Sequence, residues 1–164
     1  MNFLPVDKQN RERINAFISE RWFSTDMIIR GERIDLTKAD GIIAMENGDI
    51  IGLLTCIIRD RTCEITSLDS LKEGKGIGTA LINQVIRLAG ERGCRKLLVV
   101  TTNDNINAIR FYQKRGFDMA RLYRNALAVS RKMKPEIPLT GENGIPLSHE
   151  IEFELDLANE KTEC

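Results

Sequence analysis

The segment Lys72-Glu73-Gly74-Lys75-Gly76-Ile77-Gly78-Thr79 places three glycines within five residues, after a β-type run and before an amphipathic helix. Glycine has no side chain to block the approach of a ligand, so successive backbone N–H groups of this turn can point outward. The start of the following helix adds unpaired N–H groups and the positive end of the helix dipole. The turn therefore predicts a binding site for a phosphate or pyrophosphate group.

Two common phosphate-binding patterns do not fit this turn. A P-loop requires G-x-x-x-x-G-K-[ST], whereas here Lys75 precedes Gly76. A dinucleotide fingerprint requires G-x-G-x-x-G. Counting from Gly74 puts Thr79 at the last position, and counting from Gly76 puts Leu81 there. The strand before the turn also belongs to a run of hairpins, so the turn does not open a βαβ array.

That run covers residues 42–71, which read as three consecutive strands at 42–45, 50–58 and 62–71. The Asn47-Gly48 turn is typical of a tight hairpin, and the middle strand is apolar enough for burial on both faces. The third strand has mixed polarity, which is unusual for an interior strand. Strict alternation assigns its side chains to two faces: Cys63, Ile65, Ser67 and Asp69 against Glu64, Thr66, Leu68 and Ser70.

Hydrophobic spacing predicts the remaining elements. They are an edge strand near Pro5, helices at 8–22, 77–90, 105–115 and 124–133, strands at 27–29, 96–101, 117–123 and 150–157, and a loop at 135–148. The last strand alternates acidic and apolar residues, which predicts one solvated face. Together these elements predict a mixed, mostly antiparallel twisted sheet with helices on both faces, in the α/β class.

Composition limits the partners. The chain has 164 residues, 42% hydrophobic and 29% charged, which suits a single domain over residues 1–164. Because 24 basic residues balance 24 acidic ones, neither nucleic acid nor an anionic membrane is an expected partner. One histidine and no C-x-x-C pair predict no metal site and a reduced, cytoplasmic setting; the cysteines are Cys56, Cys63, Cys94 and Cys164.

Three motifs give the chain a family resemblance over residues 42–123. Gly76 and Gly78 occupy the glycine positions of a Gln/Arg-x-x-Gly-x-Gly/Ala turn, and Glu64-Ile65 matches a Glu-Ile pair on the strand before it. An Asn-x-x-Ala-x-x-x-Tyr-x-x-x-Gly-Phe motif is matched by Asn105, Ala108, Tyr112, Gly116 and Phe117. In this order and spacing, the chain resembles the GNAT superfamily of acyl-CoA-dependent N-acetyltransferases. Glu73 departs from the usual Gln or Arg, so either Lys72 and Lys75 supply the positive charge or Glu73 points to solvent.

The resemblance implies transfer of an acetyl group from acetyl-CoA to a primary amine, without a metal. It implies that the donor lies between two splayed parallel strands, at about 62–71 and 96–101, and that its pantetheine arm pairs with backbone near Leu68, Asp69 and Ser70. It implies that the pyrophosphate binds Gly74, Lys75, Gly76, Ile77, Gly78 and Thr79, and that Asn105 contacts CoA. Tyr112 is then the general acid facing the leaving thiolate, and Glu64 matches a position that acts as a base in some members.

Other interpretations stay open. Tyr112 also fits a core aromatic residue, and Glu64 a spectator carboxylate on the surface of a half-exposed strand. Cys63 and Cys94 are expected in the core. His149 is expected to be a surface residue of a loop, with a role as a base as the alternative. A basic group at Arg121, Arg124, Arg131, Lys132 and Lys134 is expected to be a solvated face.

The acids of the last strand, Glu150, Glu152 and Glu154, either attract a cationic amine or serve solubility, and we favour solubility. A non-catalytic acyl-CoA-binding module and a nucleotide-binding protein are alternative functions. The sequence also leaves a homodimer open.

Overall fold

A computed structural model describes residues 1–158 of the chain. Contacts divide the chain into two compact units. The first comprises residues 1–27, 35–97 and 156–158, and the second comprises residues 28–34 and 98–155. The predicted single domain over the whole chain remains a prediction. Cys164 lies outside the described residues.

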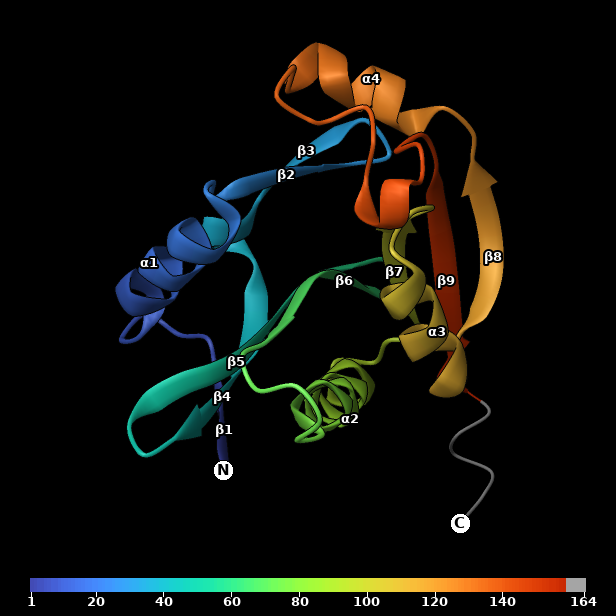
Figure 1. Ribbon diagram of the computed structural model, residues 1–164. Helices are drawn as coiled ribbons and strands as arrows, with labels where there is room; N and C mark the ends of the chain where they lie inside the picture. The colour runs from blue at the N-terminus through green and yellow to red at the C-terminus, as the bar shows by residue number, and fades with distance from the viewer. Residues whose placement is uncertain (159–164) are drawn as a thin grey trace. The chain divides into compact units, whose positions relative to one another are not determined.

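The first unit holds the hairpin run and the glycine-rich turn (Figure 1). Its elements are β1 (Asn2–Pro5), α1 (Arg11–Trp22), η1 (Leu36–Lys38), β4 (Asp40–Glu46), β5 (Asp49–Arg59), β6 (Thr62–Ser70) and α2 (Ile77–Glu91). β1 pairs with β4, β4 with β5 and β5 with β6, all antiparallel. Seven of the eleven residues of β5 are buried, which confirms the prediction from its apolar sequence.

The second unit holds the C-terminal half of the motif region. Its elements are α3 (Ile106–Lys114), β8 (Asp118–Tyr123), α4 (Ala126–Met133), η2 (Glu142–Gly144) and most of β9 (Glu150–Asp156). It also includes the end of β2 (Asp26–Ile29) and most of β3 (Glu32–Asp35), because residues 28–34 belong to it. β8 and β9 pair antiparallel although α4 and a loop separate them in sequence. The β2–β3 hairpin forms a separate two-stranded sheet, and β3 was not expected from the sequence.

β7 (Lys96–Thr102) belongs to both units, which divide it after Leu97. The backbone N–H of Arg95 donates to the carbonyl of Arg61 at 2.7 Å, so β7 begins beside the beginning of β6 and the two strands are parallel. The strand order of the large sheet is β1-β4-β5-β6-β7-β9-β8. The structure thus confirms the predicted mixed, mostly antiparallel sheet with one parallel pair.

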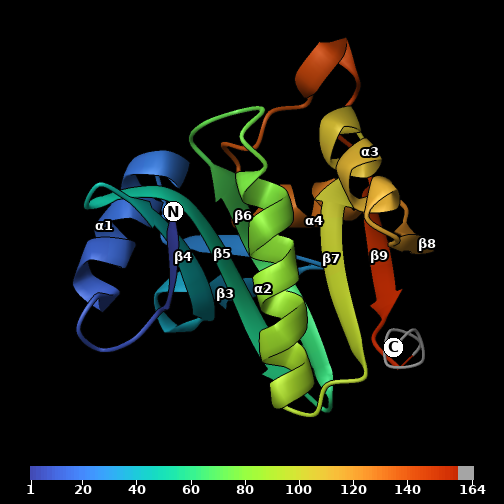
Figure 2. The same cartoon turned by 90° about the horizontal axis from the view of Figure 1, so that it is seen from below.

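Helices cover both faces of the sheet in the first unit. α2 packs along β4, β5 and β6 (Figure 2). A Cβ at Gly52 of β5 would lie 2.7 Å from Ile77 Cγ2 of α2, so glycine permits this close approach. α1 contacts the opposite face. The Trp22 indole of α1 donates a hydrogen bond to Asp69, and Asp69 pairs with Leu53 of β5. Because successive residues of a strand point to opposite faces, Leu53 and Asp69 face away from Gly52 and α2.

Candidate active site

The glycine-rich turn has a backbone that favours glycine at two positions. Gly74 has φ of +73° and Gly76 has φ of +71°, both in the left-handed region. An L-residue there costs about 1–2 kcal/mol. Beyond the glycine itself and its two chain neighbours, no atom of the described chain lies within 4 Å of a Cβ built at either position. The turn therefore combines a glycine-dependent conformation with open space above its backbone.

The turn leads directly into the N-terminus of α2. Gly76 is the N-cap, no side chain caps the helix, and the first helical hydrogen bond runs from Ala80 N to Gly76 O at 3.0 Å. The early N–H groups of a helix have no partner within the helix, and they carry the positive end of its dipole. Ile77 is 2% exposed, so its side chain anchors α2 in the core and only its backbone suits a ligand.

Charge beside the turn is shared between lysines and an acid. The Lys72 ammonium group donates to the Glu46 carboxylate of β4, and this hydrogen bond holds the pKa of Glu46 below its ordinary value. The charge of Lys75 acts in the same direction. Glu73 is exposed, in accord with the alternative in which it points to solvent. A hollow of about 160 Å³ is lined in part by Lys72, Lys75 and Ile77.

A β-bulge reorganises the faces of β6. Thr55 of β5 pairs with Ser67, and the next residue, Cys56, pairs with Ile65, so Thr66 is an extra residue in β6. The hydroxyl oxygens of Thr66 and Ser67 both lie within hydrogen-bond distance of Thr55 Oγ1, at 2.7 Å and 2.5 Å. Two neighbouring side chains of one strand therefore point to the same face.

The bulge also brings two carboxylates onto one face. Glu64 lies two residues before Thr66, and Asp69 lies two residues after Ser67, so all four share the face that α1 contacts. The strict alternation expected from the sequence, which separated Glu64 from Asp69, is wrong for this reason. Glu64 is 9% exposed, so the interpretation as a surface carboxylate is also wrong.

Asp69 has a defined hydrogen-bond partner at the end of β6. The Trp22 indole N–H of α1 donates to Asp69 Oδ2 at 2.8 Å. Burial raises the pKa of the Asp69 carboxyl group, while the Trp22 hydrogen bond and the charge of Arg21 oppose the rise. The sequence assigned to Asp69 only a backbone contact with pantetheine; nothing in the local pattern pointed to Trp22, which lies 47 residues away.

The second unit contains the other two predicted site residues. Asn105 caps α3, with its side-chain oxygen accepting from Ala108 N at 3.0 Å. Tyr112 is 6% exposed and lies within 6.0 Å, between ring centroids, of Phe111, Phe117 and Phe153. Such ring pairs contribute about 0.5–1.5 kcal/mol each. The ring of Tyr112 is thus part of a core, and the proposed role concerns its hydroxyl group.

The acids of β9 are not solvated as the sequence suggested. Glu150 is 3% exposed and accepts from the backbone N–H of Arg30 at 3.1 Å. Glu152 is 5% exposed and accepts from Arg30 Nη1 at 3.3 Å and from the Tyr123 hydroxyl at 3.2 Å. Arg30 lies more than 100 residues away in the chain, so the alternation of β9 gave no sign of it. The solubility interpretation is wrong for both residues.

The basic residues around α4 are not uniformly solvated either. Arg131 donates from Nε to the Ile137 carbonyl at 3.3 Å and from Nη2 to the Pro138 carbonyl at 2.8 Å and to the Leu147 carbonyl. These hydrogen bonds connect the loop at 135–148 to α4. His149 is half-buried, and its Nδ1 accepts from Asn125 N at 2.9 Å.

The cysteines of the described chain are core residues, as expected for Cys63 and Cys94. Cys56, Cys63 and Cys94 are free and buried. A hydrogen bond with Cys56, together with burial, raises the pKa of the Cys63 thiol, and burial raises that of Cys94. A raised pKa disfavours the nucleophilic thiolate. Within residues 1–158, no group of His, Cys, Asp and Glu is placed to hold a metal ion, and no helix is long and apolar enough to cross a membrane.

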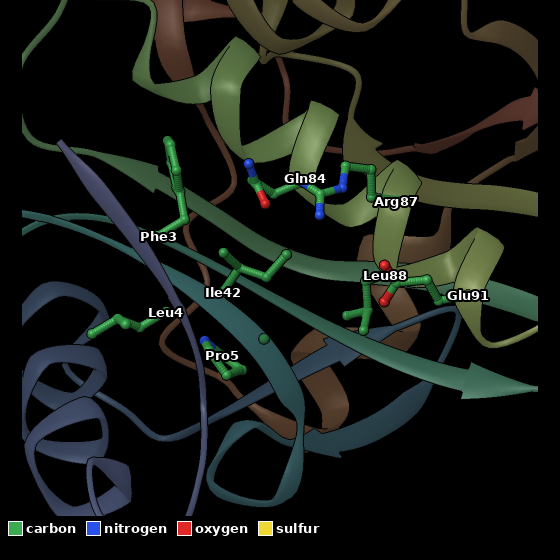
Figure 3. A pocket seen from close by; sticks show the side chains of 9 residues that line it. Phe3, Leu4, Pro5, Ile42, Gln84, Arg87, Leu88 and Glu91 are labelled. Atoms are coloured by element: carbon green, nitrogen blue, oxygen red, sulfur yellow. The ribbon is translucent and has the colours of Figure 1, made fainter.

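One cavity of the first unit lies away from the glycine-rich turn. It is about 150 Å³ in volume and lies between β1 and the C-terminal half of α2, where Phe3, Ile42 and Leu88 line it (Figure 3). Small-molecule sites usually measure about 300–1,000 Å³. A larger groove of about 730 Å³ lies between α1 and the β4–β5 hairpin, with Arg21 and Leu71 among its lining residues.

A family model described as the acetyltransferase (GNAT) family matches residues 8–117. This range includes the glycine-rich turn, the Glu64-Ile65 pair and the motif from Asn105 to Phe117. The chain belongs to the GNAT family. It is 41% identical over 152 residues to the Bacillus subtilis protein YxbD, covering 92% of this chain and 96% of the relative.

Two solved structures share this GNAT fold. An IAA acetyltransferase from Bacillus cereus superposes with a TM-score of 0.72 at 23% identity, covering 94% of this chain and 98% of the other. A GNAT acetyltransferase from Elizabethkingia anophelis with acetyl-CoA bound has a TM-score of 0.68 at 22% identity, covering 94% and 97%. At these identities the likeness concerns the fold.

Proposed function

We propose that the protein transfers an acetyl group from acetyl-CoA to a primary amine by direct attack of the amine on the thioester. The observation that carries the proposal is the turn at Gly74 and Gly76, with two left-handed glycines, open space above them and an uncapped helix start. Membership of an acetyltransferase family and the acetyl-CoA held by the Elizabethkingia anophelis relative support the same donor.

The donor is proposed to bind through the backbone of the first unit. The pyrophosphate accepts hydrogen bonds from N–H groups of residues 74–79, and Lys72 and Lys75 add positive charge. The pantetheine arm pairs with backbone at Leu68, Asp69 and Ser70. In the second unit, Asn105 is proposed as a CoA contact, although its side-chain oxygen already caps α3.

The chemistry needs an acid, a base and no metal. Tyr112 is proposed to donate its hydroxyl proton to the departing thiolate. Glu64 is proposed as a base, because its carboxylate is buried on the same face of β6 as the side chains of Thr66 and Ser67. A base is required because only a neutral amine carries the lone pair that attacks the thioester carbonyl.

Two further assignments remain proposals. The buried, free thiols of Cys56, Cys63 and Cys94 support a reducing compartment such as the cytoplasm. A homodimer remains a prediction from the sequence.

Thiol release tests the proposed reaction. Purified protein is mixed with acetyl-CoA and a panel of primary amines, and free CoA thiol is detected with a disulfide reagent. Amine-dependent release supports the proposal. Acetyl-CoA binding without release with any amine supports the non-catalytic module instead, and thermal stabilisation by ATP or NAD but not by acetyl-CoA supports a nucleotide-binding protein.

A further inference from the structure

Asp69 differs from the other polar groups on its face of β6. The hydroxyl groups of Thr66 and Ser67 are buried, and both lie within hydrogen-bond distance of the buried Thr55 hydroxyl group of β5. Asp69 is only half-buried, and among the described residues the Trp22 indole is its hydrogen-bond donor. An ionised carboxylate accepts about four hydrogen bonds, so one donor leaves it capacity for a ligand.

Partial burial disfavours the ionised form of the Asp69 side chain. Burial raises the pKa of the carboxyl group, and the Trp22 hydrogen bond and the charge of Arg21 only oppose that rise. On its own strand, the other ionisable group of this face is Glu64, five residues earlier. A carboxylate with a raised pKa is both a stronger base and a better partner for an added cation.

The surroundings of Asp69 combine exposed apolar groups with room for an organic molecule. Trp22 and Leu71 are each 41% exposed. Arg21, which precedes Trp22, and Leu71, two residues after Asp69, line the groove of about 730 Å³ between α1 and the β4–β5 hairpin. An indole face attracts an ammonium group, and a carboxylate pairs with it. An ammonium group on a carbon chain matches this combination.

We propose that Asp69 and Trp22 form a subsite that binds the ammonium group of the acceptor. Asp69 takes the first proton of this group before acetyl transfer, and Glu64, the base proposed above, takes the second as the amide forms. This inference rests on the proposed function. Asp69 suits the role because its backbone lies on the proposed path of the pantetheine arm, at the end of β6. By contrast, Glu152 of β9 already has Arg30 and Tyr123 as partners.

The proton balance of the step is complete. One ammonium proton passes to the Asp69 carboxylate, and the neutral nitrogen forms the C–N bond as the C–S bond breaks. Glu64 takes a second nitrogen proton, and Tyr112 gives its hydroxyl proton to the sulfur, so CoA leaves as a thiol. Return of the Glu64 proton to Tyr112 restores both groups. The products are an acetamide, the CoA thiol and one proton, which Asp69 releases to solvent.

Trp22 is the only tryptophan of the chain, so its fluorescence reports on the subsite directly. The protein is titrated with n-butylammonium chloride at constant ionic strength, and n-butanol serves as the uncharged probe. The variants are Asp69→Asn, which keeps an oxygen for the Trp22 hydrogen bond, and Asp60→Asn, a control in the exposed β5–β6 turn. Circular dichroism checks that each variant is folded.

We expect n-butylammonium, but not n-butanol, to change the fluorescence saturably in the unmodified protein and in Asp60→Asn. The apparent affinity should fall at least about tenfold in Asp69→Asn. An absent response, or an equal response in Asp69→Asn, overturns the inference. Calorimetric titration with CoA runs in parallel: loss of CoA binding contradicts the proposed function, whereas intact CoA binding without an ammonium response contradicts the subsite alone.

Discussion

The indole nitrogen of Trp22, the last residue of α1, donates a hydrogen bond of 2.8 Å to the Asp69 carboxylate near the end of β6. Burial raises the pKa of Asp69, so the folded state favours the protonated carboxyl group. The stability that this group contributes is full below its unfolded pKa of about 3.9 and declines as the pH rises through the folded value.

Asp69→Asn should therefore be as stable as the unmodified protein at acid pH and more stable at neutral pH. Urea denaturation across this pH range measures the difference. If the unmodified protein is the more stable of the two at neutral pH, the ionised carboxylate serves the fold, and its proposed role with an acceptor loses its energetic support.

The ion pair of Lys72 and Glu46 predicts a gain of function. Glu46 holds the Lys72 ammonium group beside the glycine-rich turn and offsets its charge. Glu46→Gln should tighten CoA binding by about twofold to fivefold at low salt, with a smaller gain at high salt because ions screen the exposed charges. Calorimetry at two salt concentrations tests this. Asp118→Asn, on exposed β8, is the charge-matched control and should leave CoA affinity unchanged.

A substitution at Tyr112 can separate the proposed catalytic role of its hydroxyl group from the packing role of its ring. Tyr112→Phe keeps the ring among Phe111, Phe117 and Phe153 and removes only the hydroxyl group. We expect kcat to fall by about 10²–10⁴-fold, the usual contribution of a general acid, with the Kd for CoA unchanged. An unchanged kcat in the thiol-release assay would leave Tyr112 as a core residue only.

Arg131 is predicted to be a stability determinant of the second unit. Its guanidinium group reaches three carbonyl groups, those of Ile137, Pro138 and Leu147. Arg131→Gln should lower the free energy of unfolding by about 1.5–3 kcal/mol, since hydrogen bonds to a charged group are lost. The neighbouring exposed Lys132→Gln should change it by less than about 0.5 kcal/mol. Equal urea midpoints for the two variants would refute the assignment.

Local sequence signals were sufficient for most elements of the fold. The apolar stripe of α2 and the apolar run of β5 each depend on residues close together in the chain, and both are found as expected. β3 was missed because only Ile34 of its four residues is buried. The left-handed Arg30-Gly31 pair before it is the turn signal that marks the hairpin.

The site was harder to predict because its side chains depend on distant partners. The bulge at Thr66 appears only in the register with Thr55, and it alone puts Glu64 and Asp69 on one face. The burial of Glu150 and Glu152 depends on Arg30, more than 100 residues away. The backbone of the turn was easier to predict from the sequence, since glycine readily adopts the left-handed conformation found at Gly74 and Gly76.

Calorimetric titration of acetyl-CoA into Gly76→Ala and Gly93→Ala tests the central claim most directly. Both glycines have left-handed backbones, with φ of +71° and +74°, and a Cβ built at either one meets no described atom within 4 Å beyond the glycine and its two chain neighbours. Both variants should lose about 1–2 kcal/mol of stability. Gly76 precedes the start of α2 and Gly93 follows its end, so only Gly76→Ala should weaken acetyl-CoA binding, by at least about tenfold. Equal affinities in the two variants would contradict the account.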